Sequence, residues 1–207
     1  MERYLRTALF EFFTEIFLMV FLKKLSEVID SFTKRTGRAV QWLLLLMILV
    51  AVYNALGRYL GRFAGVNLTS NFFLEVQWYL FSTVFLLGAS SALSEDGHVR
   101  VDVFFSSFSP EKKAKVDIAG GFLFLLPFVI FLFYLSLPSV YNSWSIFEDS
   151  PDPGGLPRYP IKTLLPVALL MLFFQGISEI IKAWIFLKKG HHKKEMHHHD
   201  AKELRGG

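Results

Sequence analysis

Four long apolar runs, each free of charged residues through its centre, divide the chain. A helix needs roughly 20 apolar residues to cross the hydrocarbon core of a bilayer. The pattern therefore predicts an all-α integral membrane protein with a transmembrane domain over residues 38–187. The four transmembrane helices are expected over about 39–60, 73–94, 110–140 and 160–187.

The start of the third span is marked by capping residues. Ser109 is a favourable N-cap, Pro110 suits the first helical position, and Glu111 follows in the first turn. A helix from Pro110 to about residue 137 reaches roughly 40 Å, which exceeds a hydrocarbon core of about 30 Å. We therefore expect this span to tilt or to protrude.

Residues 1–37 are expected to form an N-terminal interfacial amphipathic helix, because their apolar residues share one helical face while Glu11 and Glu15 lie opposite. The same two acidic residues argue against a signal peptide. No Gly or Pro occurs before Gly37, so one long helix is possible. The apolar stripe changes face near Leu18, which leaves two interpretations open. Either one half contacts lipid and the other protein, or two bent helices both lie on lipid.

Basic residues alternate along the segments between the spans. Lys and Arg number seven before the first span, then two, four, one or two, and six in the tail after Leu187. Cytoplasmic segments are enriched in Lys and Arg. We therefore expect both termini to be cytoplasmic, with residues 188–207 forming a His- and Lys-rich cytoplasmic tail.

Composition agrees with a membrane protein. Apolar residues make up 53% of the chain and the mean hydropathy is +0.40, which excludes a typical soluble domain, a disordered chain and a disulfide scaffold. The absence of Cys also excludes thiolate metal sites. Because the positive charge flanks apolar runs, we expect contact with membrane lipids and not with nucleic acid.

The predicted spans carry no ionisable residue at their centres, and all six His lie outside them. A haem protein would need His inside the bundle, and a proton relay would need a series of acidic or His groups. No phosphate-binding loop or hydrolase motif occurs in the chain. We therefore expect no enzyme activity, no catalytic residues, no cofactor and no metal site.

The segment from Phe73 to Phe105 carries the most informative pattern. Gly88 and Ala92 are four residues apart, a spacing that lets a second helix approach closely. Gly97 is expected to end the second span. The string Gly97-His98-Val99-Arg100-Val101-Asp102 follows it, with alternating apolar and charged residues typical of a short extended segment.

Together with the outer Glu75 and Trp78, this string resembles the small membrane subunit (the Q subunit) of tripartite ATP-independent periplasmic (TRAP) transporters. A second match is the loop from Ser150 to Pro157, which resembles the branch labelled as mannitol or chloroaromatic transporters. The resemblance covers about residues 28–187. It implies a partnership with a large membrane subunit of elevator type and with a periplasmic substrate-binding protein.

The resemblance also implies a role for this chain. It is expected to be a non-catalytic small permease subunit in the bacterial inner (cytoplasmic) membrane. It would scaffold the large subunit for sodium-driven uptake of an organic acid or similar solute. The alternatives are a self-contained small transporter or channel, and an adaptor subunit of another membrane complex.

Several residues are candidates for subunit contact or for a structural role. Glu75 is expected to pair with a basic group on the large subunit or with Arg58, and Trp78 to anchor at the interface. His98, Arg100 and Asp102 would either fix their loop or contact the large subunit or lipid headgroups. The loop residues Asp152, Pro153, Gly154 and Gly155 would dock the binding protein or form a rigid connector.

Overall fold

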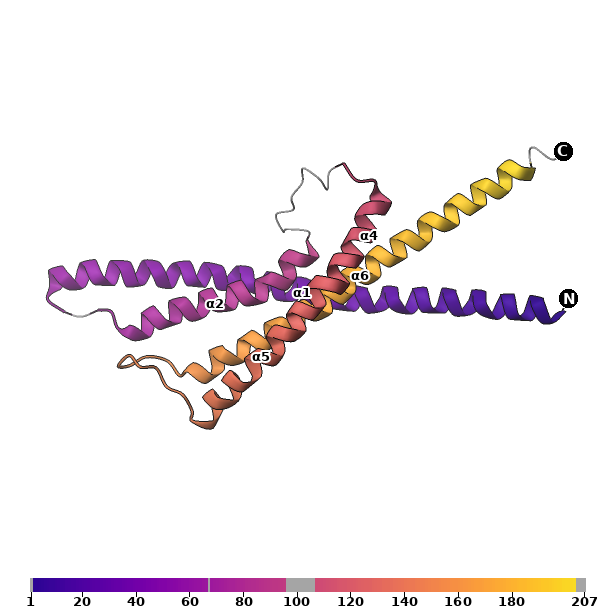
Figure 1. The fold of residues 1–207 in the computed structure, drawn as a ribbon. Coiled ribbons are helices and arrows are strands. Elements are labelled where there is room, and N and C mark those ends of the chain that lie inside the picture. The colour runs from indigo at the N-terminus through magenta and orange to yellow at the C-terminus, as the bar shows by residue number, and fades with distance from the viewer. Residues whose placement is uncertain (1, 67, 96–106, 204–207) are drawn as a thin grey trace. The chain divides into compact units, whose positions relative to one another are not determined.

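The computed structural model describes the backbone of residues 2–66, 68–95 and 107–203, and the side chains of residues 14–66, 68–95 and 107–190. Within these ranges all regular structure is helical (Figure 1). The elements are α1 (Glu2–Ala64), α2 (Asn71–Ser94), α4 (Pro110–Gly120), the π-helix η1 (Gly121–Leu125), α5 (Leu126–Ser145) and α6 (Arg158–Glu203).

Four helical stretches of the described chain are long and apolar enough to cross a membrane. They are Thr14–Ala64, Asn71–Ser94, Pro110–Ser145 and Arg158–Gly190. The predicted all-α class with four spans is therefore confirmed. The cytoplasmic location of both termini stays a prediction.

The helical backbone continues through two of the predicted domain boundaries. Helix α1 runs without a break from Glu2 to Ala64, so the predicted interfacial helix and the first span form one element. Helix α6 likewise continues past Leu187 to Glu203, into the segment that we expected to be a separate tail. Neither junction carries a Pro or a left-handed Gly that would end the helix.

The third span begins as predicted. The Ser109 hydroxyl accepts a hydrogen bond from the Lys112 N–H at 3.4 Å, and Pro110 occupies the first turn. Residues 121–125 then widen into a π-helix, in which the Leu126 N–H donates to the Gly121 carbonyl. Pro127 follows directly, and a proline ring clashes with the carbonyl four residues earlier in a regular α-helix. The π-helix lies at that carbonyl, so the wider turn accommodates the proline.

The chain divides into two compact units, each described here by itself. Unit 1 contains residues 1–31, 99–126 and 176–207, and unit 2 contains residues 32–98 and 127–175. In unit 1, the start of α1 and the late part of α6 are joined by polar contacts. A Cβ at Gly121 would lie 2.8 Å from Ile180, so the π-helix and α6 pack closely there.

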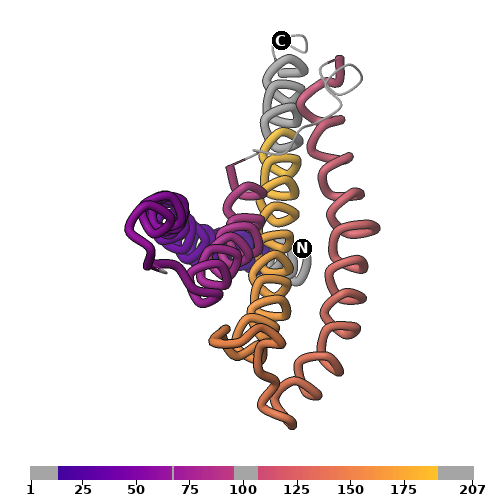
Figure 2. Tube along the Cα trace, turned by 90° about the vertical axis from the view of Figure 1, so that its left-hand side faces the viewer, coloured from indigo at the N-terminus to yellow at the C-terminus, as the bar shows by residue number. Residues whose placement is uncertain are grey.

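In unit 2, α2 runs back along the C-terminal part of α1 (Figures 1 and 2). Gly37 of α1 faces the Ser91 side chain, and the rings of Tyr53 and Phe73 lie 4.8 Å apart. The turn after α1 folds onto Gly57 and Gly61, where a Cβ would meet Thr69 and Val66. These two glycines therefore receive the return loop of their own chain.

Polar side chains face inward and large apolar side chains face outward over much of the structure. Ser90, Ser178, Gln175 and Thr33 are almost fully buried, whereas Phe85 and many other large apolar side chains are exposed. This distribution is typical of a chain surrounded by lipid and by other apolar helices.

Candidate functional site

The first candidate feature is the buried carboxylate of Glu75, near the start of α2. The side chain is only 3% exposed. Its Oε1 accepts hydrogen bonds from the Ser150 hydroxyl and from Arg158 Nη2, the latter at 2.9 Å. Its Oε2 accepts a hydrogen bond from the Leu156 N–H. A buried charge is tolerated when it is paired and hydrogen-bonded in this way.

Arg158, the first residue of α6, connects this carboxylate to other groups. Its guanidinium lies 4.6 Å from the ring centroid of Trp78, within cation–π range. It also donates a hydrogen bond to the Ser150 hydroxyl at 3.2 Å. We call Glu75, Trp78, Ser150, Leu156 and Arg158 the Glu75 cluster.

The Glu75 cluster holds the loop between α5 and α6 against the start of α2. The Tyr79 hydroxyl donates to the Pro157 carbonyl, and Asn71 Nδ2 donates to the Pro153 carbonyl at 3.2 Å. These two bonds, and those from Leu156 and Arg158 to Glu75, join residues that are 78 to 83 positions apart in sequence. The loop is therefore fixed by tertiary contacts at both its tip and its end.

The base of the loop is closed by a second ion pair. Lys162 Nζ lies 2.5 Å from Glu148 Oε2, and the Arg158 N–H donates to the Glu148 carbonyl at 2.7 Å. The hydrogen bond from Lys162 lowers the pKa of the Glu148 carboxyl below its ordinary value of 4.5. Trp144 Nε1 donates to Thr163 Oγ1 at 2.8 Å nearby.

The tip of the loop is presented outward. Asp152, Pro153 and Gly154 are exposed, and the Asp152 N–H donates to the Ser150 hydroxyl at 3.1 Å. Gly154 has a φ of +73°, a left-handed conformation that favours glycine. Gly155 lies half-buried beside Ser150 and Glu75. Of the four predicted docking residues, three therefore form an exposed tip and one supports it.

A second polar cluster lies in unit 1, between α1 and α6. Asp30 accepts hydrogen bonds from the Ser178 hydroxyl at 2.8 Å and from Lys182 Nζ at 3.1 Å. Lys182 also pairs with Glu179 at 2.6 Å. Two carboxylates share the one Lys182 ammonium in this group, and the pairs with Asp30 join α1 to α6.

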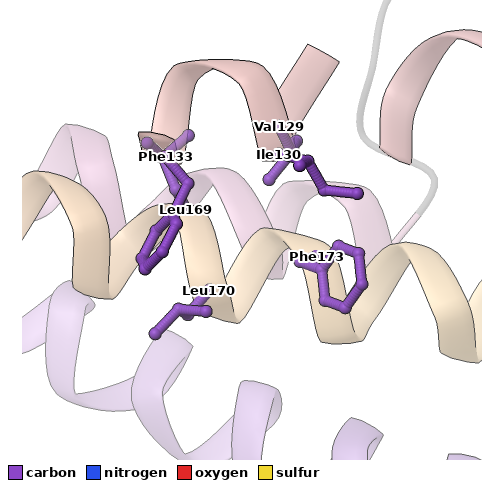
Figure 3. A pocket seen from close by; sticks show the side chains of 6 residues that line it. All are labelled: Val129, Ile130, Phe133, Leu169, Leu170 and Phe173. Atoms are coloured by element: carbon purple, nitrogen blue, oxygen red, sulfur yellow. The ribbon is translucent and has the colours of Figure 1, made fainter. Parts of the chain in front are cut away.

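Within unit 2, the buried residues of the described spans include neutral polar side chains as well as apolar ones. Thr33 donates a buried hydrogen bond of 2.7 Å to Gln175 Oε1. A cavity of about 180 Å³ lies between α5 and α6, and only apolar side chains line it (Figure 3). Among the described residues, no group of three or more His, Asp or Glu side chains is placed to hold a metal ion.

The remaining predicted residues are dispersed. Arg58 is exposed on α1, and Glu75 is paired with Arg158 instead. A Cβ at Gly88 would lie 3.8 Å from Val40, an ordinary contact distance, so this contact does not require glycine. Ala92 is half-buried one turn further along. Gly97, His98, Arg100 and Asp102 lie outside the described residues.

Sequence reasoning missed three members of the Glu75 cluster: Ser150, Leu156 and Arg158. Arg158 is the one basic residue in a loop rich in Pro and Gly, which was a usable signal for a charge partner. Leu156 contributes its backbone N–H, which no side-chain pattern reports. Trp78, expected as an interfacial anchor, stacks on Arg158.

Comparison with known proteins gives one match. The family model described as "Tripartite ATP-independent periplasmic transporters, DctQ component" matches residues 47–186, about two thirds of the chain. No curated protein and no solved structure matches significantly. The matched range includes α2, the third span, the Glu75 cluster and most of the apolar part of α6.

Proposed function

Because the chain belongs to the DctQ family of TRAP transporter components, a family of multi-pass membrane proteins, we propose that it is the small, non-catalytic permease subunit of such a transporter. The family is one part of a tripartite transporter, which implies a large membrane subunit and a binding protein. In this proposal the chain lies in a bacterial inner membrane. It supports sodium-driven uptake of an organic acid or a similar solute.

One observation carries the scaffolding role. The buried polar groups that join helices, such as Thr33, Ser178 and Glu75, bond to partners within this chain, while large apolar side chains point outward. A surface of this kind packs against lipid or against another membrane protein. The chain is thus suited to hold a neighbour in place.

We further propose that the loop tip of Asp152, Pro153 and Gly154 faces the periplasm and contacts the binding protein. The tip is exposed, acidic at Asp152, and held in one conformation by the Glu75 cluster. A surface that is already ordered binds a partner without the additional entropic cost of ordering a loop.

Single-cysteine crosslinking tests both proposals cleanly, since the chain has no Cys of its own. The chain is co-expressed with the candidate large subunit and binding protein, and D152C is coupled to a photoactivatable crosslinker. We expect D152C to crosslink to the binding protein. The matched variant E111C, in the first turn of the third span, should not.

Two results would contradict the proposals. If the chain fails to co-purify with any large membrane subunit, or if the purified chain alone moves solute into liposomes, the scaffold role is wrong. If co-purification succeeds but D152C and E111C crosslink to the binding protein equally, only the docking role of the loop is wrong.

A further inference from the structure

A second surface of unit 2 carries unbalanced positive charge beside a hollow. A groove of about 530 Å³ lies between the late part of α1 and the start of α2. Arg58, Tyr59 and Arg62 line it from α1, and Gln77 lines it from α2. The two arginines are four residues apart, so they project from the same face of α1. No acidic side chain is among the residues that line this groove.

The groove has a deeper, less polar part. Ala51 and Ala55 line it one to two turns before the arginines, and their small side chains leave room beside the helix. Leu74 of α2 lines it as well. The site therefore combines two fixed positive charges at the end of a membrane span with an apolar channel toward the span's interior. This is the polarity order of a phospholipid, from phosphate to acyl chain.

Asn54 lies in the wall of the same groove, is only 5% exposed, and lies one turn, or about 6 Å, from Arg58 along α1. Its Oδ1 is fully enclosed, so Asn54 shapes the wall of the groove and offers no exposed acceptor there.

We propose that this groove binds one anionic phospholipid. Arg58 and Arg62 bind the phosphate diester, because guanidinium groups match phosphate oxygens in geometry and charge. The acyl chain lies along Ala51 and Ala55. Basic pockets between transmembrane helices recognise lipid headgroups in this way.

The experiment titrates lipid onto the purified full-length chain in detergent and counts bound lipid by native mass spectrometry. The probes are phosphatidylglycerol, phosphatidylcholine and inorganic phosphate. We expect one phosphatidylglycerol to bind at least about tenfold more tightly than phosphatidylcholine, and inorganic phosphate alone not to compete at millimolar concentration. A tenfold difference corresponds to about 1.4 kcal/mol.

Three variants locate the site. R58Q/R62Q should lower the apparent affinity for phosphatidylglycerol about tenfold, to the level of phosphatidylcholine. K34Q/R35Q is the matched control, since it removes two exposed basic residues from the other end of the first span, and it should leave binding unchanged. A55F keeps every charge but fills the apolar channel, and it should also lose the preference. Circular dichroism verifies that each variant keeps its helical content.

Several outcomes would overturn the inference. Both lipids carry a phosphate diester, so equal binding of the two would mean that the groove has no preference for a lipid of net negative charge. An equal loss of affinity in K34Q/R35Q would mean that basic residues attract the lipid wherever they lie. Competition by inorganic phosphate identifies a site for a free anion. If R58Q/R62Q retains lipid but no longer co-purifies with the large subunit, an acidic segment of that partner occupies the groove instead.

Discussion

At the scale of single residues, the loop conformation depends on two adjacent glycines for different reasons. Gly154 has open space around it but a positive φ, whereas a Cβ on Gly155 would lie 2.7 Å from Glu75 Oε1 and would meet the Ser150 side chain. The backbone conformation favours glycine at the first position, and packing requires it at the second. The pair therefore separates the two effects in one loop.

We predict that Gly155→Ala disrupts the Glu75 cluster, while Gly154→Ala is tolerated. The strained backbone at Gly154 costs about 1 kcal/mol, and overpacking at Gly155 costs about 1–3 kcal/mol in addition to displacing the loop. Limited proteolysis of the 146–157 loop and thermal unfolding in detergent measure the difference. A loop equally protected in both variants would mean that the cluster adapts to the added methyl group.

The Glu148–Lys162 ion pair predicts a pH dependence at the loop base. The folded pKa of Glu148 is below its ordinary value of 4.5, so the stabilisation is present in full above about that pH and is lost as the pH falls through the folded value. We expect E148Q to unfold at a lower temperature than the unmodified chain at pH 7. The difference in unfolding temperature between the two chains should become smaller below pH 4.5.

Thermal unfolding across a pH series checks this prediction. Asp149 is the adjacent, exposed carboxylate of the same loop. D149N is therefore a suitable control, and its unfolding temperature should stay close to that of the unmodified chain across the pH series. If the difference in unfolding temperature between E148Q and the unmodified chain stays constant down to acidic pH, Glu148 stabilises the loop through its shape and not through its charge.

At the scale of elements, α1 shows why an amphipathic pattern alone was ambiguous. Val28 and Phe32, on the apolar stripe that follows Leu18, are exposed, whereas Ser26 and Thr33 are buried. In a membrane the polar groups of a helix pair with one another and the apolar groups face lipid. The small and polar face of α1 is the one that packs within each unit.

The closest contact between α1 and α2 is therefore expected to be sensitive at Gly37 and not at Gly88. A Cβ at Gly37 would overlap the Ser91 side chain, but one at Gly88 would find Val40 at an ordinary 3.8 Å. We predict that Gly37→Leu lowers the unfolding temperature and the yield of folded chain, by an overpacking cost of about 1–3 kcal/mol. Gly88→Ala should change stability by less than about 1 kcal/mol.

Thermal unfolding of the two variants in detergent provides the comparison. The same variants also test which glycine supports assembly, through co-purification with the large subunit. If Gly88→Ala is as damaging as Gly37→Leu, then Gly88 contacts something outside this chain.

At the scale of the whole molecule, the direction of insertion decides which surfaces meet which partners. The alternation of Lys and Arg predicts a periplasmic location for the loop after the third span and a cytoplasmic location for the segment before it. In intact cells we predict that a membrane-impermeant maleimide labels D152C, whereas it labels E111C only after lysis. Labelling of E111C in intact cells would mean that the chain has the opposite topology.

The linear pattern of the chain was sufficient for the four spans, for the cap at Ser109 and for the family resemblance. Each of these depends on residues close together in sequence: a run of apolar side chains, a capping hydroxyl or a short motif. Glu75 also stood out, because a carboxylate at the end of a span needs a partner. Its partner was not predictable, since Arg158 lies 83 residues further along the chain.

Tertiary structure decided which faces are buried and which groups meet. Hydropathy does not distinguish an apolar face that packs on protein from one that faces lipid, because both environments are apolar. The same pattern therefore left α1 with two interpretations. The Leu156 N–H and the close approach at Gly37 depend on where the backbone lies, which a list of side chains does not record.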